Sequence, residues 1–266
     1  MKDDTEDVAA LVLNLESGSM YAGFSGIDAP RAVFPTIVGR PRRQGIYGIN
    51  KDAFVGEEVF SKRGALIIKK IAKRGLITEW KDWEKLIHHT FYNELKVKPE
   101  EHPVLLSFSP NSPQEEKQKV LKTIFETFKV QKASLVNKAE LALMGAGGIT
   151  GTVLSIEEGV IYAVSLIERK AIQESTMTAE VGGSELTEYL LNILVQKGNS
   201  FTTYAEKNAV KDIKYELGYV AIDYEAEIKA GETSSSLEKS YVLPDGQVIT
   251  LGNERFKEEK HFSNLN

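Results

Sequence analysis

The sequence predicts a mixed α/β fold, in which short apolar strands alternate with amphipathic helices. Runs rich in Val, Ile and Leu recur along the chain, and between them apolar residues repeat at helical spacing. In addition, two similar strand–turn–strand segments lie far apart in the sequence, which suggests a duplicated unit whose turns face each other. The 266 residues are enough for one large domain or two smaller ones.

The strands are predicted from short β-branched and apolar runs that end at Gly, Ser or Pro. In chain order these runs are Val8–Leu13, Met20–Phe24, Val104–Phe108, Ser134–Val136, Thr152–Ser155, Val160–Leu166 and Ala171–Ser175. Near the end of the chain, residues 241–250 read as a β-hairpin around a Pro-Asp-Gly turn.

The helices are predicted from their capping residues and apolar faces. One begins near Asp82, and one begins with a capping box at Ser112 and has Pro113 at its first position. A third runs from Ser184 to Gly198. A fourth opens with Thr203 and Glu206, a capping box, and stops at Gly218.

The turns of the two repeated segments are candidate phosphate-binding loops. They are Glu16-Ser17-Gly18 and Ile156-Glu157-Glu158-Gly159. Backbone N–H groups in such turns can point at an anion, but each turn also carries a carboxylate. The glycine-rich stretch at residues 145–151 fails the dinucleotide pattern at Thr150, so it is interpreted as the end of a helix.

Composition excludes several function classes. The net charge is −5 with scattered Lys and Arg, so nucleic acid is not an expected partner. The absence of cysteine excludes disulfides and thiolate metal sites. His88 and His89 are neighbours in the sequence, and this pair alone is not expected to form a metal site. No apolar run approaches ~18 residues, so we expect no membrane insertion and a cytoplasmic location.

Longer motifs resemble the actin family. They are DAPRAVFPTIVGRPRRQG (28–45), HHTFYNEL (88–95), PEEHPVLL (99–106), SFTTYAE (200–206) and SSSLEKSYVLPDGQVITLGNERF (234–256). The resemblance covers Asp7 to about Phe256. It implies the actin-like ATPase fold, with ribonuclease H-like duplicated domains and with ATP and a divalent cation between them.

The resemblance also implies a domain division. Residues 1–144 would form the first domain, with 34–70 as a small inserted subdomain. Residues 145–266 would form a partial second domain, with 182–266 as its small subdomain. The final KEEKHFSNLN does not resemble the corresponding segment of actin, so we expect a fold that is incomplete at the C-terminus. The apolar strand residues Val153, Leu154, Val160 and Val164 would then lack a covering layer.

The positions that match the family's catalytic residues have changed. Asn14 and Ser155 stand where aspartates lead the two phosphate loops, and Glu16 replaces a turn glycine. Lys138 replaces the hinge glutamine that orients the attacking water, and Tyr162 replaces a histidine near that water. An ammonium has three donors and no acceptor for such a water. The resemblance therefore implies no catalytic residue and no metal ligand here.

A nucleotide, if one binds, would contact residues that keep the family's character. These are Ser17, Gly18, Gly159, Gly183, Lys211 and Lys214. However, a carboxylate ~4 Å from a phosphate oxygen costs about 4 kcal/mol at an effective dielectric near 20, roughly a thousandfold in affinity. Glu16, Glu157 and Glu158 are the candidates, and Lys138 could offset one of them.

Two functions remain open. The first is a non-hydrolysing actin-related subunit or regulator in a larger assembly or at a filament end. It would be located in the cytoskeleton, with actin or other assembly proteins as partners and no cofactor. The second is an actin-like protein that binds ATP or ADP with Mg²⁺ and hydrolyses it weakly or not at all. In both, the loop that contacts the next filament subunit in the family corresponds to residues 42–52, with the interface residues Arg42, Gln44, Ile46, Tyr47 and Ile49.

Overall fold

The computed structural model of the chain describes residues 8–42 and 51–257. The chain divides into two compact units, residues 1–181 and 182–266, and each has its own hydrophobic core. The division predicted after residue 144 stays a prediction.

A five-stranded sheet forms the centre of the first unit, with the strand order β10-β9-β1-β2-β3. The strands are β1 (Leu11–Leu15), β2 (Ser19–Phe24), β3 (Ala32–Pro35), β9 (Val104–Phe108) and β10 (Ala133–Asn137). β1, β9 and β10 run parallel, whereas β1, β2 and β3 form an antiparallel meander. The sequence therefore folds its first hairpin into the middle of this sheet.

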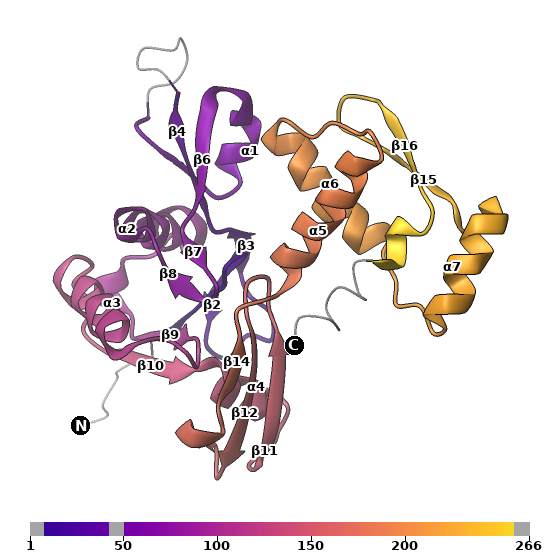
Figure 1. The fold of residues 1–266 in the computed structure, drawn as a ribbon. Coiled ribbons are helices and arrows are strands. Elements are labelled where there is room, and N and C mark those ends of the chain that lie inside the picture. Colours follow the sequence, from indigo (N-terminus) through magenta and orange to yellow (C-terminus); the bar gives the residue numbers. More distant parts are fainter. Residues whose placement is uncertain (1–7, 43–50, 258–266) are drawn as a thin grey trace, which may run out of the picture. The chain divides into compact units, whose positions relative to one another are not determined.

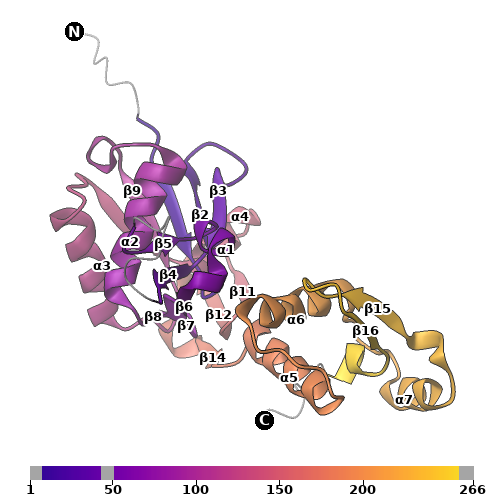
Figure 2. The same cartoon turned by 90° about the horizontal axis from the view of Figure 1, so that it is seen from above.

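Helices cover one face of this sheet (Figures 1 and 2). They are α2 (Trp80–His89), the π-helix η2 (Thr90–Leu95) and α3 (Gln114–Glu126). Alternate strand residues such as Leu11, Leu13 and Met20 pack against Trp83 of α2 and Ile124 of α3. Every second strand residue faces the helices, and the apolar face of each helix faces the sheet, so these side chains form one common core.

Smaller elements complete this half of the unit. β4 (Ile37–Pro41) pairs with β5 (Phe54–Val55) and with β6 (Leu66–Lys70), and β7 (Ala72–Lys73) pairs with β8 (Leu76–Ile77). The short helices are α1 (Glu58–Ser61), η1 (Arg63–Ala65) and η3 (Pro99–Glu101). Ile37, Phe54, Val59 and Leu66 form a separate small core there.

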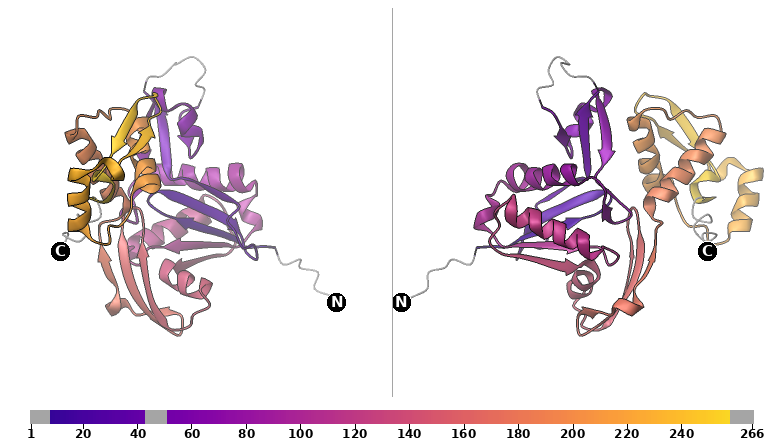
Figure 3. Two further views of the ribbon diagram at one scale, coloured as in Figure 1. Left: turned by 90° about the vertical axis from the view of Figure 1, so that its right-hand side faces the viewer. Right: turned by 60° about the vertical axis from the view of Figure 1, so that its left-hand side comes forward.

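A second sheet contains the other repeated hairpin (Figure 3). β11 (Gly151–Ile156) pairs with β12 (Ile161–Ile167), and β12 also pairs with β13 (Lys170–Ala171) and β14 (Met177–Ala179). Helix α4 (Lys138–Gly145) follows β10 and packs on one face of this sheet through Ala139 and Leu143. A short 3₁₀ helix, η4 (Gln173–Ser175), lies between β13 and β14.

The second unit packs helices against a hairpin. Its elements are α5 (Gly183–Gln196), α6 (Tyr204–Leu217), α7 (Tyr224–Thr233), η5 (Ser235–Leu237), β15 (Lys239–Val242) and β16 (Val248–Leu251). Leu190 and Leu194 of α5, Val210 and Ile213 of α6, and Leu251 of β16 are buried together. The side chain of Thr203 accepts a hydrogen bond from Glu206 N at 3.2 Å, which confirms the predicted capping box.

The predicted strands and helices are confirmed apart from their ends and one segment. Residues 171–175 were predicted as a strand, but only Ala171 is in one, and Gln173–Ser175 form a 3₁₀ turn. The predicted capping box at Ser112 is wrong as well. α3 starts one residue later than predicted, with Pro113 at its N-cap, because the Ser112 hydroxyl donates instead to the Glu116 carboxylate at 3.0 Å.

Val153, Leu154, Val160 and Val164 were expected to lack a covering layer, but only Leu154 is exposed. Val160 and Val164 are fully buried, and Val153 is partly buried, because α4 covers that face of the second sheet. Leu154 points to the opposite face and is 67% exposed.

The lengths of the helices were compared with the length that a membrane-spanning helix needs. Within the part of the chain that the structure describes, the longest helices are α5 and α6, of 14 residues each. No helix in that part combines the length and the apolar character that spanning a bilayer requires.

Candidate functional site

The two hairpin turns of the first unit lie against one another, as the sequence predicted. Each turn is closed by a backbone hydrogen bond of 2.9 Å, from Glu16 N to Ser19 O and from Glu157 N to Val160 O. A Cβ placed on Gly18 would lie 3.2 Å from Cγ of Glu158. A Cβ placed on Gly159 would lie 2.9 Å from the Ser17 hydroxyl. The two turns are therefore in van der Waals contact, and glycine is required where they meet.

A third turn, which the sequence did not predict, joins these two. Arg74 and Gly75 connect β7 to β8 with φ angles of 52° and 77°. Gly75 N donates to the Ser17 hydroxyl at 3.0 Å, and a Cβ on Gly159 would lie 2.9 Å from Arg74 N. A two-residue turn with both φ angles positive normally carries Asn-Gly or Asp-Gly. Arg74 does not fit this pattern, and Gly75 just before the apolar Leu76 and Ile77 was the sequence signal for the turn.

Ser17 is held from both sides. Its hydroxyl accepts from Gly75 N, and its carbonyl oxygen accepts from the Thr36 hydroxyl at 3.0 Å. Only 4% of Ser17 is exposed. The hydroxyl that the resemblance assigned to a nucleotide thus already has a partner within the chain.

Lys138 and Glu157 form a buried ion pair beside these turns. Lys138 Nζ lies 3.1 Å from each carboxylate oxygen of Glu157, and their side chains are 7% and 5% exposed. Lys138 is the first residue of α4, whose N-cap Asn137 accepts from Ala139 N at 2.9 Å. The helix start fixes the lysine, and the hairpin turn supplies its counter-ion. The prediction that Lys138 offsets one of the three glutamates is consistent with this pair.

Glu16 lies close to this pair. Burial raises the pKa of the Glu16 carboxyl, the nearby charge of Glu157 raises it further, and Lys138 opposes both effects. Asn14 Nδ2 donates to Glu16 Oε1 at 3.2 Å, while Asn14 Oδ1 accepts from the Ser107 hydroxyl. Asn14 therefore uses both ends of its amide on protein partners.

Tyr162 completes the cluster. Burial, as the largest cause, raises the pKa of its phenol, and the Glu157 carboxylate adds to the effect. Its hydroxyl hydrogen-bonds to the side chains of Ser155 and Glu157. Tyr162 is therefore a neutral group held by its neighbours. The four positions interpreted as altered catalytic residues, namely Asn14, Lys138, Ser155 and Tyr162, all take part in one network.

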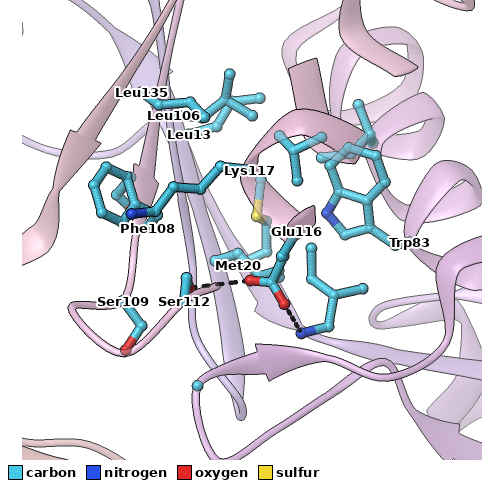
Figure 4. A pocket seen from close by; sticks show the side chains of 16 residues that line it. Leu13, Met20, Trp83, Leu106, Phe108, Ser109, Ser112, Glu116, Lys117 and Leu135 are labelled. Carbon is cyan, nitrogen blue, oxygen red and sulfur yellow. Dashed lines mark hydrogen bonds between the residues drawn. The ribbon is translucent and has the colours of Figure 1, made fainter. Parts of the chain in front are cut away.

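A small cavity lies next to the network (Figure 4). It measures about 40 Å³, and its wall includes Leu13, Met20, Trp83 and Glu116. Glu116 lies between Met20 and Trp83. Glu116 accepts from the Ser112 hydroxyl and from Ile77 N at 3.0 and 3.1 Å, and burial raises the pKa of its carboxyl. A cavity of this size has room for a few water molecules and no nucleotide.

The remaining predicted nucleotide contacts belong to the second unit. Lys214 Nζ donates to the carbonyl oxygen of Gly183, so these two residues do lie together. Lys211 and Lys214 place their ammonium groups 5.8 and 4.9 Å from the centre of the Tyr215 ring.

Of the predicted interface residues, only Arg42 lies within the described part of the chain. Its Nε donates to Leu66 O at 3.3 Å, and its backbone N donates to Ala65 O at 3.0 Å. Gln44, Ile46, Tyr47 and Ile49 fall outside the described residues.

No group of three or more His, Cys, Asp or Glu side chains arranged to hold a metal ion occurs in residues 8–42 and 51–257. In the network, the Lys138 ammonium forms an ion pair with the Glu157 carboxylate. The Glu16 carboxyl lies close to this pair, and its raised pKa favours the protonated form.

A comparison with protein families agrees with the motifs. A family model described as Actin matches residues 5–263. This match spans both units and both hairpins. The chain therefore belongs to the actin family.

Proposed function

We propose that this chain is a structural, non-hydrolysing member of the actin family, which acts through protein contacts rather than through nucleotide turnover. The observation that carries the proposal is the buried pair of Lys138 and Glu157. Members of the family normally bind ATP with Mg²⁺. Here the buried ammonium nearest the two turns is neutralised by a carboxylate of the chain itself.

Electrostatics supports the same proposal. Two carboxyl groups, Glu16 and Glu157, share the neighbourhood of one ammonium, Lys138. A polyphosphate brought beside them would add negative charge where the pKa of Glu16 is already raised by burial and by Glu157. At an effective dielectric near 20, each unit charge pair at ~4 Å would cost about 4 kcal/mol. The residues around the turns therefore do not fit a magnesium polyphosphate.

The groups present also lack the means to position an attacking water. Phosphoryl transfer depends on positioning and on charge stabilisation by metal ions and side chains. Lys138 directs its donors at Glu157, and the Tyr162 hydroxyl is engaged by Ser155 and Glu157. Asn14 and Ser155 supply no carboxylate for a metal ion. Loss of hydrolysis follows from these positions together.

Membership of the actin family favours partners among actin and other cytoskeletal assembly proteins, and a place in the cytoskeleton of the cytoplasm. These remain parts of the proposal.

A rival function is nucleotide binding with weak or no hydrolysis. It is favoured by the two facing glycine-containing turns and by Lys138, whose charge would become available if Glu157 turned away. The two functions differ in one measurable respect, the affinity of the wild-type chain for Mg-ATP.

Titration calorimetry with Mg-ATP and Mg-ADP tests the proposal. The wild type is expected to show no saturable heat, whereas Glu16→Gly combined with Glu157→Gln should gain binding, since it removes two carboxylates and frees the ammonium. Glu126→Gln, on the exposed face of α3, is the matched control and should behave as the wild type does. Saturable micromolar binding by the wild type would refute the proposal and favour the rival function.

A further inference from the structure

The small cavity beside the network has an apolar end and a polar end. Figure 4 shows Leu13, Leu106 and Leu135 grouped together in its wall, away from Ser109 and Glu116. The polar lining residues come from the end of β9, the loop that follows it and the beginning of α3. They are Ser107, Ser109, Ser112, Glu116 and Lys117.

The Ser109 hydroxyl is buried in this wall without a hydrogen bond. Ser109 is 2% exposed, and its hydroxyl has no hydrogen-bond partner within residues 8–42 and 51–257. The side-chain oxygen of Asn111, in the same loop, is also buried, and it too has no partner among those residues. A buried hydroxyl without a partner loses its hydrogen bonds to water and gains none in return, so such groups are rare in folded proteins. The Ser109 hydroxyl therefore indicates a ligand that can form hydrogen bonds.

The Glu116 carboxylate can accept further hydrogen bonds at the same end of the cavity. Its Oε1 accepts from the Ser112 hydroxyl, and its Oε2 accepts from Ile77 N. A carboxylate oxygen has two lone pairs, so each of these oxygens has capacity for one more donor. The polar end thus offers both a free hydroxyl and a carboxylate to a ligand.

The turn between β7 and β8 lies against this polar end. Gly75 lines the cavity, and a Cβ placed on it would lie 2.9 Å from the Ser109 hydroxyl. Ile77, two residues further on, donates its backbone N–H to Glu116 at 3.1 Å. The β7–β8 turn, the loop after β9 and the start of α3 therefore meet at the polar end, and a ligand there would join all three.

The volume of the cavity restricts the identity of this ligand. The cavity measures about 40 Å³. A single water molecule needs ~10–15 Å³, whereas a cavity that binds benzene measures about 150 Å³. Roughly three water molecules would therefore fill the space, and an organic ligand as large as benzene is excluded. Wholly apolar cavities stay dry, but here a hydroxyl and a carboxylate supply the polar partners that an ordered water molecule needs.

We propose that this cavity is an internal hydration site, in which about two or three ordered water molecules bridge the Ser109 hydroxyl and the Glu116 carboxylate. One water molecule hydrogen-bonds to Ser109, and one donates to Glu116. The leucine side chains confine them to the polar end. The water molecules hold the loop after β9 against the β7–β8 turn, which in turn contacts both hairpin turns. This inference goes beyond the proposed function and does not depend on it.

Three measurements on the wild-type chain test the inference. A high-resolution crystal structure should show ordered water within about 3.2 Å of the Ser109 hydroxyl and of a Glu116 oxygen. Crystals under xenon pressure should contain no xenon in this cavity, because xenon enters dry apolar cavities. Magnetic relaxation dispersion of the solvent should detect these water molecules in solution, since they exchange more slowly than the surface hydration layer.

Two variants show whether the hydroxyl holds the water. Ser109→Ala removes the free hydroxyl and should lose at least one slowly exchanging water molecule. Ser61→Ala is the matched control, because it removes an exposed hydroxyl that donates to Glu58 O and does not line the cavity. Its count of slowly exchanging water molecules should equal that of the wild type. Circular dichroism of each variant reports whether it is folded.

The contrary results are distinct. Xenon in the wild-type cavity, or no ordered water at its polar end, would show that the cavity is dry and would overturn the inference. A folded Ser109→Ala variant that keeps the wild-type count would show that the hydroxyl holds no water, and it would overturn the inference as well. None of these measurements involves Mg-ATP, so failure here is separate from failure of the proposed function.

Discussion

At the scale of single residues, the central feature is the ion pair of Lys138 and Glu157 beside the two turns. Both side chains are nearly removed from solvent, at 7% and 5% exposure. Burying two charges costs much of what their attraction gains. The pair therefore contributes little net stability, but removing either partner leaves an uncompensated buried charge.

This gives a stability prediction. Lys138→Met alone and Glu157→Met alone should each lower the free energy of unfolding by about 3–5 kcal/mol, whereas Lys138→Met/Glu157→Met should lower it by much less. Urea unfolding followed by tryptophan fluorescence measures all three. Lys122→Met, which removes an exposed partner 4.0 Å from Glu126, should change the stability by less than about 1 kcal/mol. Additive losses in the double variant would contradict the coupling.

Glu16 gives a prediction about pH. Burial and Glu157 raise the pKa of its carboxyl above the ordinary value of 4.5, so the folded state favours the protonated form. The stability from this group is fully present below the unfolded-state pKa, and it is lost as pH rises through the folded-state pKa. The wild type should therefore lose stability relative to Glu16→Gln as pH rises from 4 to 8.

The difference in unfolding free energy between the wild type and Glu16→Gln, measured at several pH values, isolates this group from other titrating residues. A difference that does not depend on pH would mean that Glu16 titrates as an exposed carboxyl does.

At the scale of elements, the turns require glycine where they touch. A Cβ on Gly159 would lie 2.9 Å from both the Ser17 hydroxyl and Arg74 N. Gly159→Ala should therefore destabilise the first unit by about 1–3 kcal/mol. Gly64→Ala is the control, because nothing lies within 4 Å of its added Cβ. Thermal unfolding of both variants compares them, and equal behaviour would show that the turns can separate at no cost.

The cap of α6 is a second prediction at this scale. Thr203→Ala should lower the stability of the second unit by about 1 kcal/mol, because Glu206 N loses its acceptor. Thr203→Ser keeps the hydroxyl and should be close to neutral. Hydrogen exchange of the first-turn amides of α6 measures the effect, and unchanged protection in Thr203→Ala would contradict the role of the cap.

Local patterns were sufficient to predict β1, β2, β9 to β12, β15, β16, α2, α3, α5 and α6, but β3 to β8, β14 and α7 were not predicted. The run Val104–Phe108 coincides with β9, and the Thr203 box marks the start of α6, because both depend on signals within a few residues. The segment 171–175 failed because its apolar residues are followed by Gln173 and Glu174, which form a 3₁₀ turn instead of pairing with β12. The Arg74-Gly75 turn was missed because its position depends on contacts with Ser17 and Gly159, far away in the sequence.

The candidate site could be predicted only in part, because its contacts also join residues that lie far apart in the sequence. The altered residues at positions 14, 138, 155 and 162 are visible in the sequence, but their pairing is not. The contact between Lys138 and Glu157 spans 19 residues, and that between Asn14 and Ser107 spans 93. Sequence alone left open whether the glutamates face the turns or the solvent, and the folded positions of α4 and β12 decide it for Glu157.

At the scale of the whole molecule, the chain matches the family over nearly its whole length, while residues at its turns differ from those that the resemblance implies. The match to the Actin model spans residues 5–263, although the aspartates, the glutamine and the histidine expected at the turns are absent. The charge of Lys138 is paired within the chain and the side chain of Leu154 is exposed, and both observations are consistent with the proposed action through protein contacts.

The most direct test of this account is the thermal unfolding of the wild-type chain with and without Mg-ATP. A ligand at one hundred times its Kd adds about 2.7 kcal/mol to the stability of the folded state. For a chain of this size that would raise Tm by about 5 °C or more. The account predicts an unchanged Tm in 5 mM Mg-ATP, and an increase of that size would contradict it.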